Sequence, residues 1–174
     1  MIRAKFYTSM DCPADVFDIR RRVFAEELGL KSTGAQDAGD QMAVYALALD
    51  ADDAPASTGR MHIDGLGHFV IDRVCSLKEA RGQGLGDLIM RMLLYRAQEL
   101  NAAMVFLATP PELVDFFARY GFKAYGALTE EDGAPQRLMR VLATEINLEG
   151  TCGGSHACAG CAQNCDTCGE GSHE

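Results

Sequence analysis

A glycine-rich turn in the middle of the chain has the residue types that bind phosphate. Its glycines let the backbone turn tightly and leave N–H groups uncovered. The helix expected after them adds a positive dipole end and further unpaired N–H groups. Together with the fixed charge of Arg81, these features predict a cradle for phosphate. The residues of this turn are Arg81, Gly82, Gln83, Gly84, Leu85, Gly86 and Asp87.

The spacing of these glycines excludes two common phosphate-binding loops. A P-loop needs a Lys followed by Ser or Thr after its glycines, and neither pair follows Gly86. A dinucleotide fingerprint places G-x-G-x-x-G after the first strand of a βαβ unit, whereas this turn lies in mid-chain. A tight strand-to-helix turn without a ligand is the alternative to a binding loop.

Two cysteine pairs near the C-terminus have the spacing of metal ligands. They are Cys158-x-x-Cys161 and Cys165-x-x-Cys168, and each pair can bring two thiolates to one metal. Zinc and an iron–sulfur cluster are both compatible, although the three residues between the pairs match neither a zinc ribbon nor a bacterial ferredoxin. From residue 150 the chain has no Val, Ile, Leu, Met or aromatic residue, so this segment cannot form a hydrophobic core. The alternative to a metal site is therefore a disordered tail with redox-labile thiols.

A charged pair interrupts the apolar side of the helix predicted over residues 14–28. Arg20 and Glu27 are seven residues apart and therefore point to the same side. Charges at such positions are costly unless they are paired, hydrated or used. We therefore expect Glu27 to line a cleft, with local pairing or extension to solvent as the alternative.

The rest of the chain alternates strand and helix patterns that would position these groups. Alternating and fully apolar runs predict strands, and 3.6-residue periodicity predicts helices. We expect an α/β domain over residues 1–148 and a separate cysteine-rich tail over residues 149–174. The expected strands are 2–8, 43–49, 57–63, 68–77, 103–108, 123–128 and 136–146, and the expected helices are 14–28, one starting at 85, and 110–120.

The central turn resembles the R/Q-x-x-G-x-G/A signature of the GNAT superfamily of N-acetyltransferases. Arg81, Gly84 and Gly86 occupy its defining places. The resemblance implies a mixed, mostly antiparallel sheet with helices on both faces, and a loop that holds the pyrophosphate of acetyl-coenzyme A. It also implies that the central strand diverges from its neighbour and pairs with the pantetheine arm through Val74, Cys75 and Ser76.

The first helix refines this resemblance. The run V-F-x-x-E that ends at Glu27, followed by Asp37 and Asp40, resembles the ElaA-type branch of the superfamily. Acyl-homoserine lactone synthases share a similar opening and a D-x-x-D, and they use acyl-carrier protein and S-adenosylmethionine. They lack the R-x-x-G-x-G loop, so we place them second.

A second signature resembles the family with one departure. Residues 116–122 read F-F-A-R-Y-G-F, where the family usually has F-Y-x-x-x-G-F. Phe117 therefore stands where the family's Tyr protonates the departing thiolate, and Phe has no proton to give. Tyr120 lies three residues further along and is the candidate to replace this missing proton donor.

The resemblance implies transfer of an acetyl group from acetyl-coenzyme A to a primary amine. A base must remove the amine proton, directly or through water, and a backbone amide would polarise the thioester carbonyl. Glu27 is the first candidate base, with Glu26 and Asp72 behind it. A coenzyme A-binding metal or redox sensor without turnover is a third hypothesis, favoured by Phe117 and the cysteine tail.

Composition limits the partners of the protein. The 174 residues carry a formal net charge of −9, which disfavours nucleic acid and acidic membrane surfaces. No apolar run approaches the length of a membrane span, and the first residues do not resemble a signal peptide. We expect a cytoplasmic protein whose partner is an amine acceptor, without nucleic acid or membrane, and we leave a homodimer open.

Overall fold

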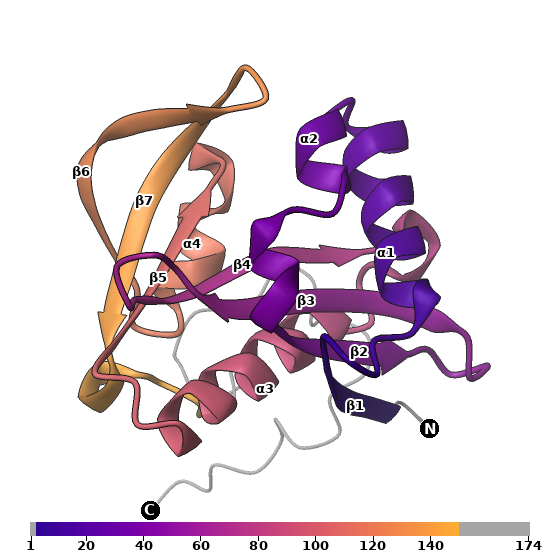
Figure 1. The fold of residues 1–174 in the computed structure, drawn as a ribbon, viewed down its shortest axis with the longest axis horizontal. Coiled ribbons are helices and arrows are strands. Elements are labelled where there is room, and N and C mark those ends of the chain that lie inside the picture. Colours follow the sequence, from indigo (N-terminus) through magenta and orange to yellow (C-terminus); the bar gives the residue numbers. More distant parts are fainter. Residues whose placement is uncertain (1–2, 150–174) are drawn as a thin grey trace, which may run out of the picture.

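Seven strands form one mixed sheet in the computed structural model, which describes residues 3–149 (Figure 1). Their order is β1-β2-β3-β4-β5-β7-β6, and every neighbouring pair is antiparallel except β4 and β5. This architecture confirms the predicted α/β class and the mostly antiparallel sheet. The strands are β1 Arg3–Thr8, β2 Val44–Leu49, β3 Pro55–Ile63, β4 Phe69–Ser76, β5 Met104–Thr109, β6 Lys123–Glu131 and β7 Ala134–Leu142.

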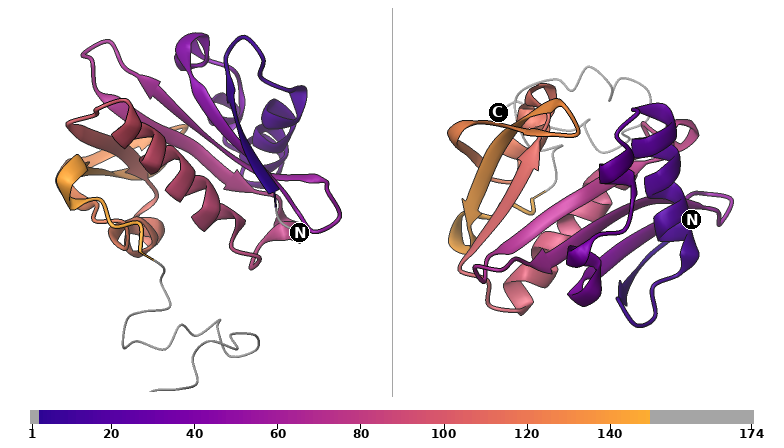
Figure 2. Two further views of the ribbon diagram at one scale, coloured as in Figure 1. Left: turned by 90° about the horizontal axis from the view of Figure 1, so that it is seen from below. Right: turned by 45° about the horizontal axis from the view of Figure 1, so that its top comes forward.

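Helices lie on both faces of the sheet (Figures 1 and 2). The long helix α3 (Leu85–Glu99) covers one face, and α1 (Ala14–Arg20) lies on the other together with η1 (Arg21–Glu27) and α2 (Lys31–Gly34). Short turns complete the fold: η2 Ala38–Met42, η3 Lys78–Ala80, η4 Pro111–Leu113, α4 Val114–Ala118 and η5 Ala143–Glu145. Within residues 3–149, no helix is both long and apolar enough to cross a membrane.

Helix α3 packs closely on the sheet because β3 carries a glycine beneath it. A Cβ atom on Gly59 would lie 2.7 Å from Cγ2 of Ile89 and 2.9 Å from Cδ1 of Leu93. Any side chain would therefore push the helix away from the strand. The buried side of the helix consists of Leu85, Ile89, Met90, Leu93, Leu94 and Ala97.

The first helix has the predicted extent but a mixed geometry. It begins as the α-helix α1 and continues as the π-helix η1, which ends before Gly29 at a φ of +73°. Asp11, which precedes this helix, does not cap it, because its carboxylate accepts hydrogen bonds from the N–H and the hydroxyl of Thr8. The N-cap residue is Pro13, and it has no side-chain cap.

Strands β4 and β5 run in parallel but pair over only two positions. Phe69 pairs with Val105, and Val70 pairs with Phe106. From Ile71 onward no residue of β4 pairs with β5, and the two strands separate (Figure 1). The divergence expected from the family resemblance is therefore present, and it leaves the β5 side of β4 without a strand partner from Ile71 onward.

A buried cluster of arginines and aspartates lies on the α1 side of the sheet. Arg60 of β3 is 2% exposed and contacts three carboxylates: Asp37 at 2.6 Å, Asp40 at 2.9 Å and Asp72 at 2.7 Å. Arg20 of α1, 1% exposed, contacts Asp40 at 2.7 Å. Burial opposes ionisation of these carboxyls, but the arginines outweigh it and lower the pKa of all three.

A bulge in β4 brings one more arginine into this cluster. Gly59 faces two residues of β4, because Thr58 pairs with Cys75 while Arg60 pairs with Asp72. Arg73 within the bulge has a φ of +54°. A bulge changes the alternation of side chains along a strand, so Asp72 and Arg73 both reach the cluster although they are consecutive. Arg73 contacts Asp37 at 3.0 Å. The arginine–aspartate cluster comprises Arg20, Arg60, Arg73, Asp37, Asp40 and Asp72.

We predict that Arg60→Ala lowers the free energy of unfolding by about 3–5 kcal/mol, because it removes a buried guanidinium that contacts three carboxylates at once and leaves their negative charges only partly compensated. Urea denaturation at neutral pH measures the change. Arg3→Ala is the matched control: Arg3 pairs with Asp53 at the surface, where both side chains are more than half exposed. Its loss should cost less than about 1 kcal/mol. Equal losses in the two variants would contradict the prediction.

Candidate active site

The glycine turn connects η3 to the first residue of α3. Gly82 has a φ of +82° and Gly84 a φ of +75°. A Cβ atom on either residue would meet nothing within 4 Å. These positions therefore need glycine for the backbone conformation rather than for space.

The turn presents a series of backbone N–H groups without partners. Within the described residues, no hydrogen bond engages the N–H of Gly82, Gln83 or Gly84. The N–H groups of Leu85, Gly86 and Asp87 belong to the first turn of α3, where no carbonyl precedes them in the helix. The dipole of a fifteen-residue helix adds positive potential here. Such a series can bind an anion such as a phosphate.

Arg81 does not extend freely from the turn. Its Nη1 and Nη2 atoms donate to the two carboxylate oxygens of Glu27 at 2.8 and 2.7 Å. Its Nε donates to the carbonyl of Ser76 at 3.2 Å. The hydrogen bonds from Arg81 lower the pKa of Glu27. One guanidinium therefore joins the glycine turn, the end of β4 and the end of η1.

The residues expected to face a pantetheine arm form the end of β4. Val74, Cys75 and Ser76 lie beyond the point where β4 leaves β5. Ser57 of β3 supports this end, because its hydroxyl donates to the carbonyl of Cys75 at 2.9 Å and lies 2.7 Å from the Ser76 hydroxyl. The Cys75 thiol is buried, and burial raises its pKa to about 12. Cys75 is thus a protonated core thiol at neutral pH.

The other candidate carboxylates are engaged in ion pairs. Glu26 is exposed and contacts Arg21. Asp72 belongs to the arginine–aspartate cluster and also lies 3.3 Å from Nε2 of His62. The structure therefore brings Glu27 to Arg81, whereas Glu26 and Asp72 pair with residues outside the glycine turn.

Tyr120 reaches the start of α3 from the chain segment after α4. It is 1% exposed, and its hydroxyl donates to Oδ1 of Asp87 at 2.6 Å. Burial and this hydrogen bond raise the pKa of Tyr120. Burial opposes the charge of Asp87, yet hydrogen bonds from Arg91 and Tyr120 lower its pKa. The Asp87 carboxylate thus accepts hydrogen bonds from Arg91 and Tyr120. Its backbone N–H lies in the first turn of α3, where it has no partner within the helix.

Sequence reasoning missed the main partners of these groups. It did not identify Arg60 or Arg73 as partners of the candidate carboxylates, and it did not identify the role of the Asp87 carboxylate. The positive φ of Arg73 has no sequence signal, because nothing in its residue type favours that conformation. Arg91 could have been found, since it follows Asp87 by one helical turn.

The predicted metal ligands lie outside the described residues. Cys158, Cys161, Cys165 and Cys168 all belong to the region 150–174, so their zinc or iron–sulfur assignment stays a prediction. Within residues 3–149, no cluster of His, Cys, Asp and Glu side chains has the arrangement of a metal site. The predicted boundary between residues 148 and 149 also stays a prediction.

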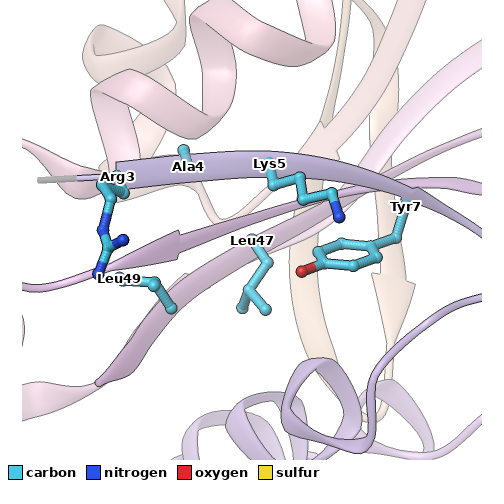
Figure 3. Close-up of a pocket in the computed structure, with 6 residues that line it drawn as sticks. All are labelled: Arg3, Ala4, Lys5, Tyr7, Leu47 and Leu49. Atoms are coloured by element: carbon cyan, nitrogen blue, oxygen red, sulfur yellow. The ribbon is translucent and has the colours of Figure 1, made fainter. Parts of the chain in front are cut away.

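A surface cavity of about 290 Å³ lies in a different part of the sheet (Figure 3). It is formed by the edge strand β1 and its neighbour β2, where Arg3, Lys5 and Tyr7 project toward the same side as Leu47 and Leu49. Arg3 is paired with Asp53, and the Lys5 ammonium lies 5.0 Å from the centre of the Tyr7 ring. None of the predicted site residues lines this cavity.

The diverging central strands, the glycine turn and the helix behind it are the features that the resemblance to N-acetyltransferases predicted. Residues 21–143 match the family model described as an acetyltransferase (GNAT) domain. The chain therefore belongs to the GNAT family of acyl-coenzyme A N-acyltransferases.

Individual relatives agree with this assignment. The chain is 27% identical over 110 residues to the uncharacterized N-acetyltransferase YjcF of Bacillus subtilis (strain 168), covering 63% of this chain and 76% of that protein. The structure is similar to an acyl-CoA N-acyltransferase from Pseudomonas aeruginosa, with a TM-score of 0.70, 27% identity, and coverage of 81% of this chain and 99% of the other. Escherichia coli ElaA has a similar fold, with a TM-score of 0.71, 21% identity, and coverage of 81% and 99%.

We predict that Tyr120→Phe lowers the free energy of unfolding by about 1.5–3 kcal/mol, because the partly buried carboxylate of Asp87 loses a hydrogen-bond donor. Urea denaturation is again the measurement. Tyr95→Phe provides the control, since Tyr95 lies on the same helix as Asp87 and is 54% exposed. A Tyr120→Phe variant as stable as the control would show that the contact with Asp87 contributes nothing.

Proposed function

We propose that the protein transfers the acetyl group of acetyl-coenzyme A to a primary amine of a small molecule or peptide. The observation that carries this proposal is the series of unpartnered N–H groups from Gly82 to Asp87, a few residues after the end of a strand that has left its neighbour. The family assignment supports an acyl-coenzyme A cosubstrate. In this proposal the N–H groups bind the diphosphate, and the free side of β4 from Val74 to Ser76 pairs with the pantetheine arm.

With acetyl-coenzyme A bound in this way, we propose that the acetyl group passes directly from the thioester to the amine. The neutral amine nitrogen attacks the thioester carbonyl carbon, the carbon–sulfur bond breaks, and the amine loses a proton as the thiolate gains one. We propose that a backbone N–H at the bulge of β4, near Arg73 and Val74, polarises the carbonyl oxygen. A bulge interrupts the regular ladder at this position, and a fixed N–H aimed at developing charge is an effective stabiliser.

The candidate bases are poorly suited to remove the amine proton. Hydrogen bonds from Arg81 lower the pKa of Glu27. Burial raises the pKa of Asp72, but its contacts with Arg60 and His62 outweigh burial and lower the pKa. A carboxylate with a lowered pKa is a weak base at neutral pH. We therefore propose that the proton leaves through water, and that Tyr120 acts by holding Asp87 rather than as the acid.

The metal centre of the tail is proposed on spacing alone. Four thiolates from Cys158 to Cys168 would hold zinc or an iron–sulfur cluster. The acetyl transfer proposed here needs no group from this tail.

Isothermal titration calorimetry with acetyl-coenzyme A tests the cosubstrate assignment. The wild-type protein should bind, and Arg81→Ala should weaken binding by about tenfold or more, because it removes the fixed charge beside the diphosphate and the link to Ser76. Arg96→Ala is the control, since Arg96 pairs with Glu99 at the far end of α3. A wild-type protein that does not bind acetyl-coenzyme A would overturn the proposed function.

The pH dependence of turnover tests the route of the proton. With two amine acceptors of different pKa, the rising limb of kcat/KM should move by the difference between the amine pKa values. The reason is that Glu27 and Asp72 are already ionised at every pH where the amine begins to lose its proton. A rising limb at one fixed pH for both amines would instead indicate a titrating group of the enzyme.

A further inference from the structure

The contact between Glu27 and Arg81 joins the first helix to the glycine turn. It is bidentate, with donor–acceptor distances of 2.8 and 2.7 Å. The third nitrogen of the same guanidinium is held by the carbonyl of Ser76. Three contacts therefore fix the plane and the position of the Arg81 side chain, which still is 44% exposed.

A neighbouring ion pair, between Arg22 and Glu79, has a single contact and serves as a comparison for the bidentate pair of Arg81 and Glu27. Arg22 of η1 contacts Glu79 of η3 at 2.6 Å through one nitrogen, and the Glu79 side chain is 62% exposed. The Glu27 side chain is 30% exposed and accepts two hydrogen bonds. A bidentate arginine–carboxylate pair has a defined geometry that a single contact lacks.

The glycine turn needs such an anchor. Gly82 and Gly84 have wide conformational freedom, and no atom lies within 4 Å of the space that a Cβ would occupy on either residue. Packing at these two positions therefore does little to hold the turn. A loop whose residues must become ordered when a ligand binds has a lower affinity, because the ordering costs free energy. An anchor at Arg81, the first residue of the turn, lowers that cost.

We propose that Glu27 is a positioning residue that holds Arg81, and through it the glycine turn, in the arrangement that binds a diphosphate. This inference rests on the proposed function, because it assigns Glu27 to the binding of coenzyme A. It replaces the general-base role that the sequence predicts for Glu27. Two Arg81 hydrogen bonds occupy its carboxylate, but the guanidinium retains N–H groups that can face a ligand.

The test compares Glu27→Gln with Glu79→Gln by calorimetry. Each variant removes one negative charge near the turn, but only the first removes the bidentate contact. The probes are coenzyme A and pantetheine, which shares the thiol arm and has no diphosphate. We expect Glu27→Gln to bind coenzyme A roughly three- to fivefold more weakly, as suits a partly exposed pair. Pantetheine binding should not change, and Glu79→Gln should stay within about twofold of wild type for both probes.

Kinetics and a double variant separate positioning from a structural role. The KM for acetyl-coenzyme A should rise with the loss of affinity, while kcat at saturation changes less than about twofold. In an Arg81→Lys background, which already lacks a bidentate donor, Glu27→Gln should have little further effect on coenzyme A binding. Additive losses would show that Glu27 acts independently of Arg81.

Other results would overturn the proposal. Unchanged coenzyme A affinity with kcat reduced by a factor of about a hundred would identify Glu27 as a general base. Tighter binding in Glu27→Gln would mean that Glu27 competes with the diphosphate for Arg81. Equal weakening for coenzyme A and pantetheine would indicate damage to the strand rather than to the turn. These outcomes leave the proposed function standing, whereas absence of coenzyme A binding in the wild type would overturn both.

Discussion

The buried guanidinium of Arg60 constrains the arrangement of the N-terminal half of the molecule. A charge that is 2% exposed must be compensated inside the protein. Its carboxylate partners come from the segment before β2 and from β4, and Arg20 links one of them to α1. A buried network of this kind contributes little net stability against an apolar core of equal volume, but it penalises every arrangement that leaves one member unpaired. We therefore regard the cluster as the feature that specifies how the first helix sits on the sheet.

The candidate site depends on two interruptions of regular sheet structure. Strand β4 loses its partner β5 after two pairs, and it bulges at Arg73 against Gly59. The first interruption frees backbone groups, and the second turns Asp72 and Arg73 toward the same cluster. An unpaired backbone in the middle of a sheet is costly unless something else satisfies it, so the cluster that fixes β4 also keeps this unusual strand in place. The same strand ends at Ser76, whose carbonyl holds Arg81.

Most elements could be predicted from the sequence because their signals are local. Apolar periodicity identified the strands and the long helices to within a few residues, and the glycine spacing identified the turn before α3. The helix expected over 110–120 proved shorter, because η4 precedes α4 and α4 ends at Ala118. The rest required long-range information. Whether Glu27 meets Arg81, fifty-four residues away, or whether Arg73 adopts a positive φ, depends on how the elements pack. The change from α- to π-helix at Arg21 likewise leaves no pattern in the residues.

The first helix connects the two charged systems of the molecule. Arg20, at the end of its α-helical part, enters the arginine–aspartate cluster, and Glu27, at the end of its π-helical part, holds Arg81. The two residues interrupt the apolar side of the helix in the sequence. In the structure, each forms an ion pair with a residue from another segment: Arg20 with Asp40, and Glu27 with Arg81. A π-helical turn places successive side chains differently from an α-helical turn, so it sets where Glu27 lies relative to Arg20. If Glu27 positions Arg81 as we propose, the geometry of this one helix couples the packing of the sheet to the arrangement of the glycine turn.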